Sequence, residues 1–159
     1  GIEVKYSIPE VPAIANADAN RLKQVFMNIL DNALKYSRSP SKIFVKAEFT
    51  KLDNQNFVKI AIADQGCGIS KEDLPHVKEK FYKANVSVRG SGIGLAVTNE
   101  IVNLHHGKLE IDSQEGKGTL VTIYLPVENS PTKNELNDMN QNETVQDAEI
   151  NEGVEINKN

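Results

Sequence analysis

Two asparagines and a lysine share one face of the most strongly periodic segment of the chain. Asn28, Asn32 and Lys35 are spaced four and three residues apart, so on a helix they fall within about 60° of each other. Amide oxygens can ligate a hard cation such as Mg²⁺, and a lysine ammonium can pair with phosphate. The pattern predicts either a site for a metal-bound phosphate compound or the solvated side of an ordinary amphipathic helix.

A carboxylate followed by two glycines forms a second candidate site. Asp64, Gly66 and Gly68 come directly after a run of alternating apolar residues that predicts a strand. A carboxylate at this position can accept a hydrogen bond from the exocyclic amine of a purine, and glycines let the backbone approach a flat ring. Asp and Gly are also ordinary turn residues, so a plain turn is the alternative.

Two further glycine-rich segments follow in the chain. Residues 90–95, Gly-Ser-Gly-Ile-Gly-Leu, precede a helical pattern, and backbone N–H groups at a helix start favour anions. The third glycine comes one residue too early for the dinucleotide fingerprint, and a flexible glycine joint is the alternative. Residues 116–119, Gly-Lys-Gly-Thr, depart from the P-loop pattern. They are interpreted as a tight hairpin turn, with Thr119 as a candidate nucleotide contact.

The elements that must position these residues are read from the apolar periodicity. Asp18 is an N-cap candidate for a long helix whose apolar stripe repeats at helical spacing, and Ser39-Pro40 stops that helix. Strands are expected within residues 2–8, 43–49, 58–63, 109–111 and 120–125, a short helix over 74–81 and a second long helix over 93–104. This mixture predicts an α+β fold: a two-layer sandwich with helices on one face of a mixed, mostly antiparallel sheet.

The composition divides the 159 residues into two parts. Residues 128–159 carry eight acidic and two basic residues, a net charge of −6. The chain's net charge of −4 therefore leaves +2 for residues 1–127. A nearly neutral folded part argues against a nucleic-acid binder. The acidic, Asn-rich segment 128–159 is predicted to be disordered, and its removal is expected to leave the melting temperature unchanged.

Neither the apolar pattern nor the cysteine content indicates a membrane span or a disulfide. No apolar run approaches the roughly 18–20 residues that a span needs, and the amino terminus lacks a signal-peptide pattern. The single cysteine, Cys67, permits no internal disulfide and is interpreted as a small side chain filling the loop. We expect a soluble, cytoplasmic fragment without direct membrane contact, whatever the parent chain contains.

Taken in order, the motifs resemble the N, G1, F, G2 and G3 boxes of bacterial sensor histidine kinases. The matching segments begin at Asn28, Asp64, Lys80, Gly90 and Gly116, and the resemblance covers roughly residues 1–127. It implies the catalytic and ATP-binding (HATPase_c) domain with the Bergerat fold of the GHKL superfamily, shared with gyrase, MutL and the large heat-shock chaperones. Residues 1–127 would then be this domain, and residues 128–159 a tail.

The resemblance assigns roles to individual residues. It implies that Asn32 ligates the Mg²⁺ that bridges the ATP phosphates, and that Asn28 and Lys35 are catalytic residues near the phosphates. Tyr36 would pack against adenine, and Asp64 would select adenine through its amino group. The other nucleotide-binding residues that it implies are Gly66, Gly68, Ile69, Phe81, Tyr82, Lys83, Arg89, Gly90, Ser91, Gly92, Ile93, Gly94, Leu95 and Thr119. Residues 83–91 would form a short lid, with Lys83 where Arg is commoner and Ser91 where Thr is commoner.

The function that the resemblance implies is ATP-dependent transfer of the γ-phosphoryl group to a histidine on a separate dimerisation domain. Its partners would be that domain and a response regulator. The acceptor histidine would lie on the separate domain, because none of the three histidines here stands in an acceptor motif. An ATPase or serine kinase of the same superfamily is an alternative. Hydrolysing relatives carry a glutamate base where Asn28 stands, which disfavours efficient hydrolysis. A nucleotide-binding interaction module without transfer activity is a third reading.

Overall fold

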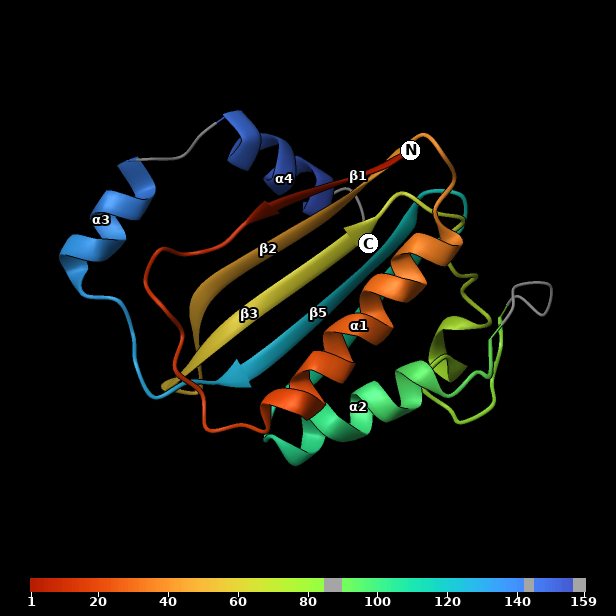
Figure 1. Ribbon diagram of the computed structural model, residues 1–159, viewed down its shortest axis with the longest axis horizontal. Coiled ribbons are helices and arrows are strands. Elements are labelled where there is room, and N and C mark those ends of the chain that lie inside the picture. The colour runs from red at the N-terminus through yellow and green to blue at the C-terminus, as the bar shows by residue number, and fades with distance from the viewer. Residues whose placement is uncertain (85–89, 142–144, 156–159) are drawn as a thin grey trace.

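A five-stranded sheet forms the centre of the computed structural model, which describes residues 1–84, 90–141 and 145–155 (Figure 1). The strands lie in the order β1-β2-β3-β5-β4. The pair β1–β2 is parallel, and the other neighbouring pairs are antiparallel. The mixed, mostly antiparallel α+β sheet is therefore confirmed. The strand bounds are β1 Ile2–Ser7, β2 Ser41–Leu52, β3 Gln55–Asp64, β4 Lys108–Gln114 and β5 Gly118–Pro126.

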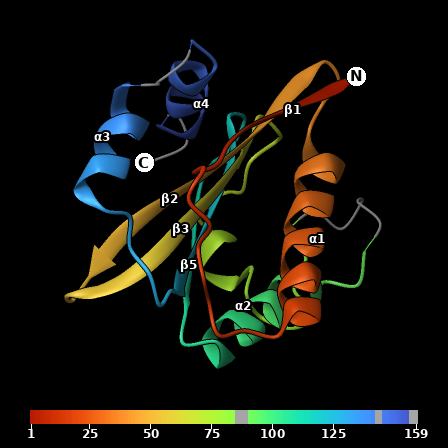
Figure 2. The ribbon, with the colours of Figure 1, turned by 60° about the vertical axis from the view of Figure 1, so that its left-hand side comes forward.

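Two helices, α1 (Ala19–Tyr36) and α2 (Gly94–Leu104), cover one face of the sheet, which we call the front face (Figures 1 and 2). Asp18 is the N-cap of α1, since its side chain accepts a hydrogen bond of 3.0 Å from the Arg21 N–H. The apolar stripe of α1 packs on alternating strand residues because strand side chains point to opposite faces of a sheet. The buried core of this face consists of Val25, Ile29, Ala33, Ile43, Val58, Ile62, Ile101, Val102, Leu109, Val121, Ile123, Leu125 and Val127.

A histidine joins the two front helices at one end. The Asp18 N–H donates to Nε2 of His105 at 3.0 Å, and Nδ1 of His105 lies 2.8 Å from the Ile101 carbonyl oxygen. Because Nε2 accepts, the ring proton resides on Nδ1, which donates to the carbonyl. The amino end of α1 is thereby fixed against the carboxyl end of α2.

The opposite face of the sheet, the back face, is covered by α4 (Val145–Glu155), as Figure 2 shows. The sequence predicted helices on one face, so this cover is a correction to the two-layer description. Ile150 and Val154 of α4 are buried, and they complete a second core cluster with Phe44, Ala61, Ala63 and Leu120 of the strands. Four apolar side chains on the back face need a cover, and α4 supplies it.

The segment between the sheet and α4 is also attached to the rest of the fold. Asn129 accepts a hydrogen bond from the Ile14 N–H and donates one to the Pro12 carbonyl, both at 2.8 Å. α3 (Lys133–Gln141) follows and is largely exposed. Disorder was predicted for residues 128–159, whereas the described part forms two helices. Burial of Ile150 and Val154 against the sheet contributes to offsetting the entropy cost of ordering this segment. Residues 142–144 and 156–159 lie outside the described residues.

The connection after β3 contains less helix than the periodicity indicated. The helix expected over residues 74–81 is a single 3-10 turn, η1 (Leu74–His76). Ser70 stabilises the turn that leads into η1, because its hydroxyl accepts from the Asp73 N–H at 3.1 Å and donates to the Asp73 carboxylate at 2.8 Å. Within the described ranges, no helix combines the length and the apolar character required to cross a bilayer.

Candidate functional site

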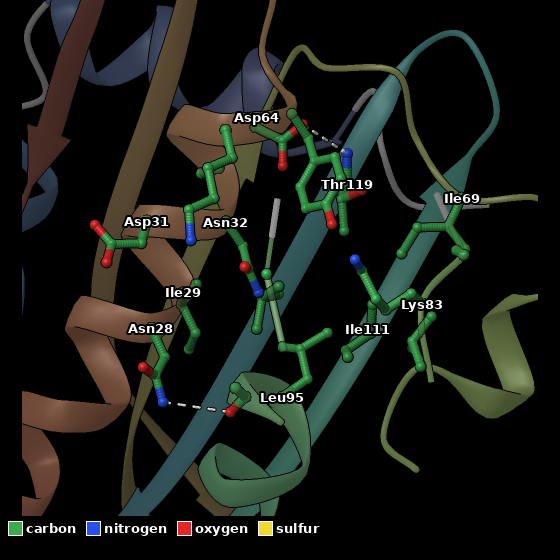
Figure 3. A pocket seen from close by; sticks show the side chains of 18 of the residues that line it. Asn28, Ile29, Asp31, Asn32, Asp64, Ile69, Lys83, Leu95, Ile111 and Thr119 are labelled. Carbon is green, nitrogen blue, oxygen red and sulfur yellow. Dashed lines mark hydrogen bonds between the residues drawn. The ribbon is translucent and has the colours of Figure 1, made fainter. Parts of the chain in front are cut away.

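A cavity of about 260 Å³ opens on the front face, between α1, the start of α2 and the adjoining ends of β3 and β5 (Figure 3). This volume is close to the lower end of the range for small-molecule sites. Most of the residues that the sequence nominated line it, although they come from segments far apart in the chain. They are Asn28, Asn32, Lys35, Tyr36, Asp64, Gly68, Ile69, Tyr82, Lys83, Gly90, Ser91, Gly92, Gly94, Leu95 and Thr119.

The polar stripe of α1 forms one wall of this cavity. Val25, Ile29 and Ala33 are at most 3% exposed, and their burial in the front core fixes the rotation of the helix about its axis. With the helix so rotated, Asn32 lines the cavity (Figure 3), and so does Lys35. The wall therefore presents an amide and an ammonium group to any occupant, donors and acceptors that suit phosphate and a hard cation.

Asn28 connects this wall to α2. Its Nδ2 donates to the Gly94 carbonyl and to the Thr98 hydroxyl, both at 3.3 Å, and Thr98 is fully buried. Since both bonds use the amide nitrogen, Oδ1 is directed away from α2 (Figure 3). The side chain is thus held in one orientation with an acceptor oxygen available on the α1 wall.

Asp64 stands at the end of β3 and is only 7% exposed. Its Oδ1 accepts hydrogen bonds from the Gly66 N–H at 2.8 Å and from the Thr119 N–H at 3.2 Å. Burial raises the pKa of this carboxyl from 3.8 to about 6, while the two N–H donors act in the opposite direction. At neutral pH the group is mainly ionised, which makes it a buried acceptor at the edge of the cavity.

The glycines around Asp64 are required by contacts within the protein itself. A Cβ on Gly66 would meet the Tyr36 carbonyl oxygen at 2.5 Å. One on Gly68, which has φ +67°, would meet the Gln114 carbonyl oxygen at 2.0 Å. A Cβ on Gly118, with φ +134°, would lie 2.0 Å from the Asp64 carbonyl oxygen. The sequence interpretation gave Gly66 and Gly68 to the ligand and placed Gly118 in a hairpin turn. All three let neighbouring loops interlock through their backbones, and we call this the glycine interlock.

Several nominated residues do not line the cavity. Gly66 and Ile93 are not among its lining residues, and Phe81 is 73% exposed with a left-handed φ of 69°. The neighbouring Tyr82 does line the cavity, and its hydroxyl donates to the Asp73 carboxylate. Phe81 is thus exposed to solvent, whereas Tyr82 lines the cavity. Arg89 lies outside the described residues.

The sequence interpretation missed the apolar floor of the cavity. Ile62 of β3, Ile111 of β4 and Val121 of β5 line it together with residues of α1 and the η1 region. The alternation of apolar residues along each strand would have identified the strand members, because residues two apart share a face. An apolar floor suits a flat ring such as a purine. The missed residues are Ile29, Asp31, Ala33, Ile62, Cys67, Val77, Ala84, Ile111 and Val121.

Comparison with known proteins identifies bacterial relatives, a kinase among them. The chain is 39% identical over 120 residues to sporulation kinase E of Bacillus subtilis, covering 76% of this chain and 15% of the relative. It is 34% identical over 137 residues to the non-motile and phage-resistance protein of Caulobacter vibrioides, covering 84% of this chain and 16% of the relative. The chain therefore spans about a sixth of the length of these two relatives.

Solved structures give the same picture of the fold. The mycobacterial sensor histidine kinase MprB superposes with a TM-score of 0.69 at 30% identity, covering 81% of this chain and 84% of that one. Full-length ShkA, crystallised with AMPPNP, also gives a TM-score of 0.69, at 23% identity, covering 83% of this chain and 27% of that one. The model of the histidine kinase-, DNA gyrase B- and HSP90-like ATPase family matches residues 17–129. The chain belongs to this family.

Proposed function

We propose that this chain is the nucleotide-binding catalytic unit of a sensor histidine kinase, and that it binds ATP with Mg²⁺. The observation that carries the proposal is the pairing of two walls across one cavity. On one side stand the amides and ammonium of α1, and on the other the buried carboxylate of Asp64 above an apolar floor. A purine triphosphate has complementary parts in the same arrangement.

Asp64 recognises the purine in this proposal. Its ionised carboxylate accepts a hydrogen bond from the exocyclic amine of adenine, while Ile69 and Tyr36 contact the ring. Guanine presents a carbonyl oxygen where adenine presents this amine, so the acceptor would face another acceptor. Burial strengthens this discrimination because an unpaired polar group costs more in a low-dielectric environment.

The α1 wall holds the phosphates and the cation. Asn32 would ligate Mg²⁺ through its amide oxygen, with Oδ1 of Asn28 nearby and Lys35 paired with phosphate oxygens. This donor set fits Mg²⁺, which accepts a few hard oxygen ligands and otherwise keeps waters and substrate phosphates. When bound, the ion would neutralise charge on the phosphate oxygens. Lys83 and the backbone N–H groups that open α2 add positive potential on the other side.

The reaction is transfer of the γ-phosphoryl group to a histidine imidazole nitrogen on a dimerisation domain. The bond from phosphorus to the ADP oxygen breaks and a bond from phosphorus to nitrogen forms. Catalysis of such transfers rests mainly on positioning and on charge stabilisation, which Asn28 and Lys35 provide. Further along this proposed pathway, a response regulator receives the group. The catalytic unit comprises residues 1–127 and works in the cytoplasm, within a larger receptor.

Hydrolysis of ATP by the domain alone is disfavoured by the state of Asn28. Its amide nitrogen already donates to the Gly94 carbonyl and to the Thr98 hydroxyl, and an amide has no basic site that could accept a proton from water. A superfamily ATPase would need a general base there. We therefore favour phosphoryl transfer over hydrolysis.

The test mixes the protein with γ-labelled ATP, Mg²⁺ and a panel of histidine-containing dimerisation domains. We expect acid-labile phosphate on the histidine of a matching domain. Calorimetry with Mg-ATP accompanies it, and Asn32→Ala and Asp64→Ala are each expected to abolish detectable binding. If both variants bound Mg-ATP as the parent does, the assignment of the cavity would be overturned.

A further inference from the structure

α4 packs on β1, β2 and β3, and its buried residues share one core cluster with the strand ends that carry the nucleotide-site residues. Ala63 and Leu120 are partners in the β3–β5 ladder, and both belong to the back-face cluster under Ile150 and Val154. Asp64 follows Ala63, and Thr119 precedes Leu120. Because successive strand residues point to opposite faces, Asp64 and Thr119 lie on the front face and line the cavity. α4 and the candidate site thus share two strand ends.

The backbone of α4 lies so close to the sheet at Gly153 that a larger side chain would not fit there. A Cβ on Gly153 would lie 2.5 Å from two carbons of the Phe44 ring, so the helix backbone rests on the ring itself. Glycine inside a helix lowers its intrinsic stability by about 1 kcal/mol relative to alanine. A glycine at this contact position, facing a ring that is only 3% exposed, indicates a specific docking surface.

Charge complementarity fixes the orientation of α4. Glu149 pairs with Lys5 of β1 at 2.6 Å and with Lys42 of β2. Hydrogen bonds from Lys42 and Lys5 lower the pKa of the Glu149 carboxyl. The acidic composition of the tail, unexplained by the sequence interpretation, therefore supplies at least one anchor to a basic edge of the sheet.

We propose that α4 is a positioning clasp for the nucleotide site: docked on the back face, it holds the ends of β3 and β5 from which Asp64 and Thr119 meet the purine. This proposal rests on the function proposed above. Because linkage is reciprocal, nucleotide binding tightens α4 docking by the same factor by which docking tightens nucleotide binding. Any event that removes α4 from the sheet weakens nucleotide binding without touching the cavity.

The test uses full-length variants that weaken the clasp far from the cavity. Glu149→Lys places a cation beside Lys5 and Lys42, whereas Glu152→Lys makes the same charge change on the exposed side of α4. We expect Glu149→Lys to accelerate hydrogen exchange in residues 145–155 and 118–121 and to raise the Kd for ATP at least about fivefold. Glu152→Lys should match the parent, and adding Lys42→Glu to Glu149→Lys should recover most of the loss.

A second variant separates docking from helix formation. Gly153→Ala raises the intrinsic helix propensity of α4, so an undocked helix would exchange more slowly in this variant. In the docked arrangement the added methyl meets the Phe44 ring, and we expect faster exchange together with a raised Kd for ATP. Slower exchange with unchanged affinity would overturn the docking.

The outcomes distinguish this proposal from the function on which it rests. If the parent protein fails to bind ATP, the proposed function fails, while exchange in residues 118–121 still reports whether α4 braces the strand ends. If Glu149→Lys releases α4 but leaves the Kd for ATP unchanged, the positioning role is overturned and the proposed function stands. Rapid exchange of residues 145–155 in the parent would overturn the clasp itself.

Discussion

The two faces of the sheet are held by different means. The front face is covered by two helices that are joined to each other through His105 at one end and Asn28 at the other. The back face is covered by α4, which reaches the sheet through the connecting segment and is held by Ile150, Val154 and Glu149. The front is thus an integral part of the fold. We expect the back cover to be able to leave while the sheet stays intact.

This difference predicts how each face responds to damage. We expect a destabilising substitution in the front core or the glycine interlock to lower the free energy of global unfolding by its full amount, because the surrounding residues have no alternative arrangement. A change under α4 can cost no more than the docking free energy of that helix, because the helix can detach.

The largest effect is expected in the glycine interlock. Gly68→Ala should lower the free energy of unfolding by about 3 kcal/mol or more, since it combines a left-handed φ with a Cβ placed 2.0 Å from a backbone oxygen. Gly116→Ala is the matched control, because φ is +80° there but nothing lies within 4 Å. It should cost about 1–2 kcal/mol, the left-handed penalty alone. Equal costs in denaturant titrations would contradict the interlock.

Two buried isoleucines compare the faces directly. Ile29 on the front is 1% exposed and Ile150 on the back is 0% exposed. Ile29→Ala should cost about 2–5 kcal/mol of global stability, as cavity-forming substitutions in cores do. Ile150→Ala should cost less globally and should release residues 145–155 to hydrogen exchange. A cooperative loss of equal size at both positions would show that α4 is as integral as α1.

The third prediction concerns the buried carboxyl of Asp64, which lowers the stability of the fold once it is ionised. As pH rises from about 4 to about 6, unfolded Asp64 loses its proton before the folded one does, so this group lowers stability over that window. Asp64→Asn removes the penalty. Above pH 6.5 the variant should be more stable than the parent by about 2–3 kcal/mol, with little difference near pH 4. Melting curves across this range test the sign, and ATP affinity should fall in the same variant.

The smallest effect is expected where the tail leaves the sheet. Asn129→Ala removes two hydrogen bonds to the segment that precedes α1 and should cost about 1 kcal/mol. Asn134→Ala, on exposed α3, is the control and should change the melting temperature little. If Asn129→Ala had no effect on the melting temperature, α4 alone would hold the tail.

The front face could be predicted from the sequence because its signals are local. The stripe on α1, the Asp18 cap and the alternation in β2 and β3 each lie within a single window of the chain. The same windows oriented Asn32 and Lys35 toward one side of α1, which the fold then turned to the cavity. Local pattern could not reveal that Phe81 is exposed while Tyr82 lines the cavity. Both are adjacent aromatic residues, and the backbone conformation of the loop decides which side chain faces the cavity.

The back face was missed because its signal is divided between distant segments. The polar composition of the tail predicted disorder, and among the side chains that the structure describes α4 contributes Ile150 and Val154 to the back-face core. The complementary half of the signal stood in β3, where Ala61 and Ala63 interrupt the expected polar alternation. A strand that is apolar on both sides indicates that both sides are covered. Combining the two halves would have predicted the third layer.

The glycine interlock has a consequence for how this site can diversify. The rim beside Asp64 is set by backbone atoms in contact at Gly66, Gly68 and Gly118, so its shape does not depend on side-chain rotamers and offers no position for gradual change in size. Altered ligand preference would have to arise from the α1 wall or from the segment that follows Tyr82. In a saturation library, we expect tolerated variation to gather on those two sides and the loops below them to remain glycine.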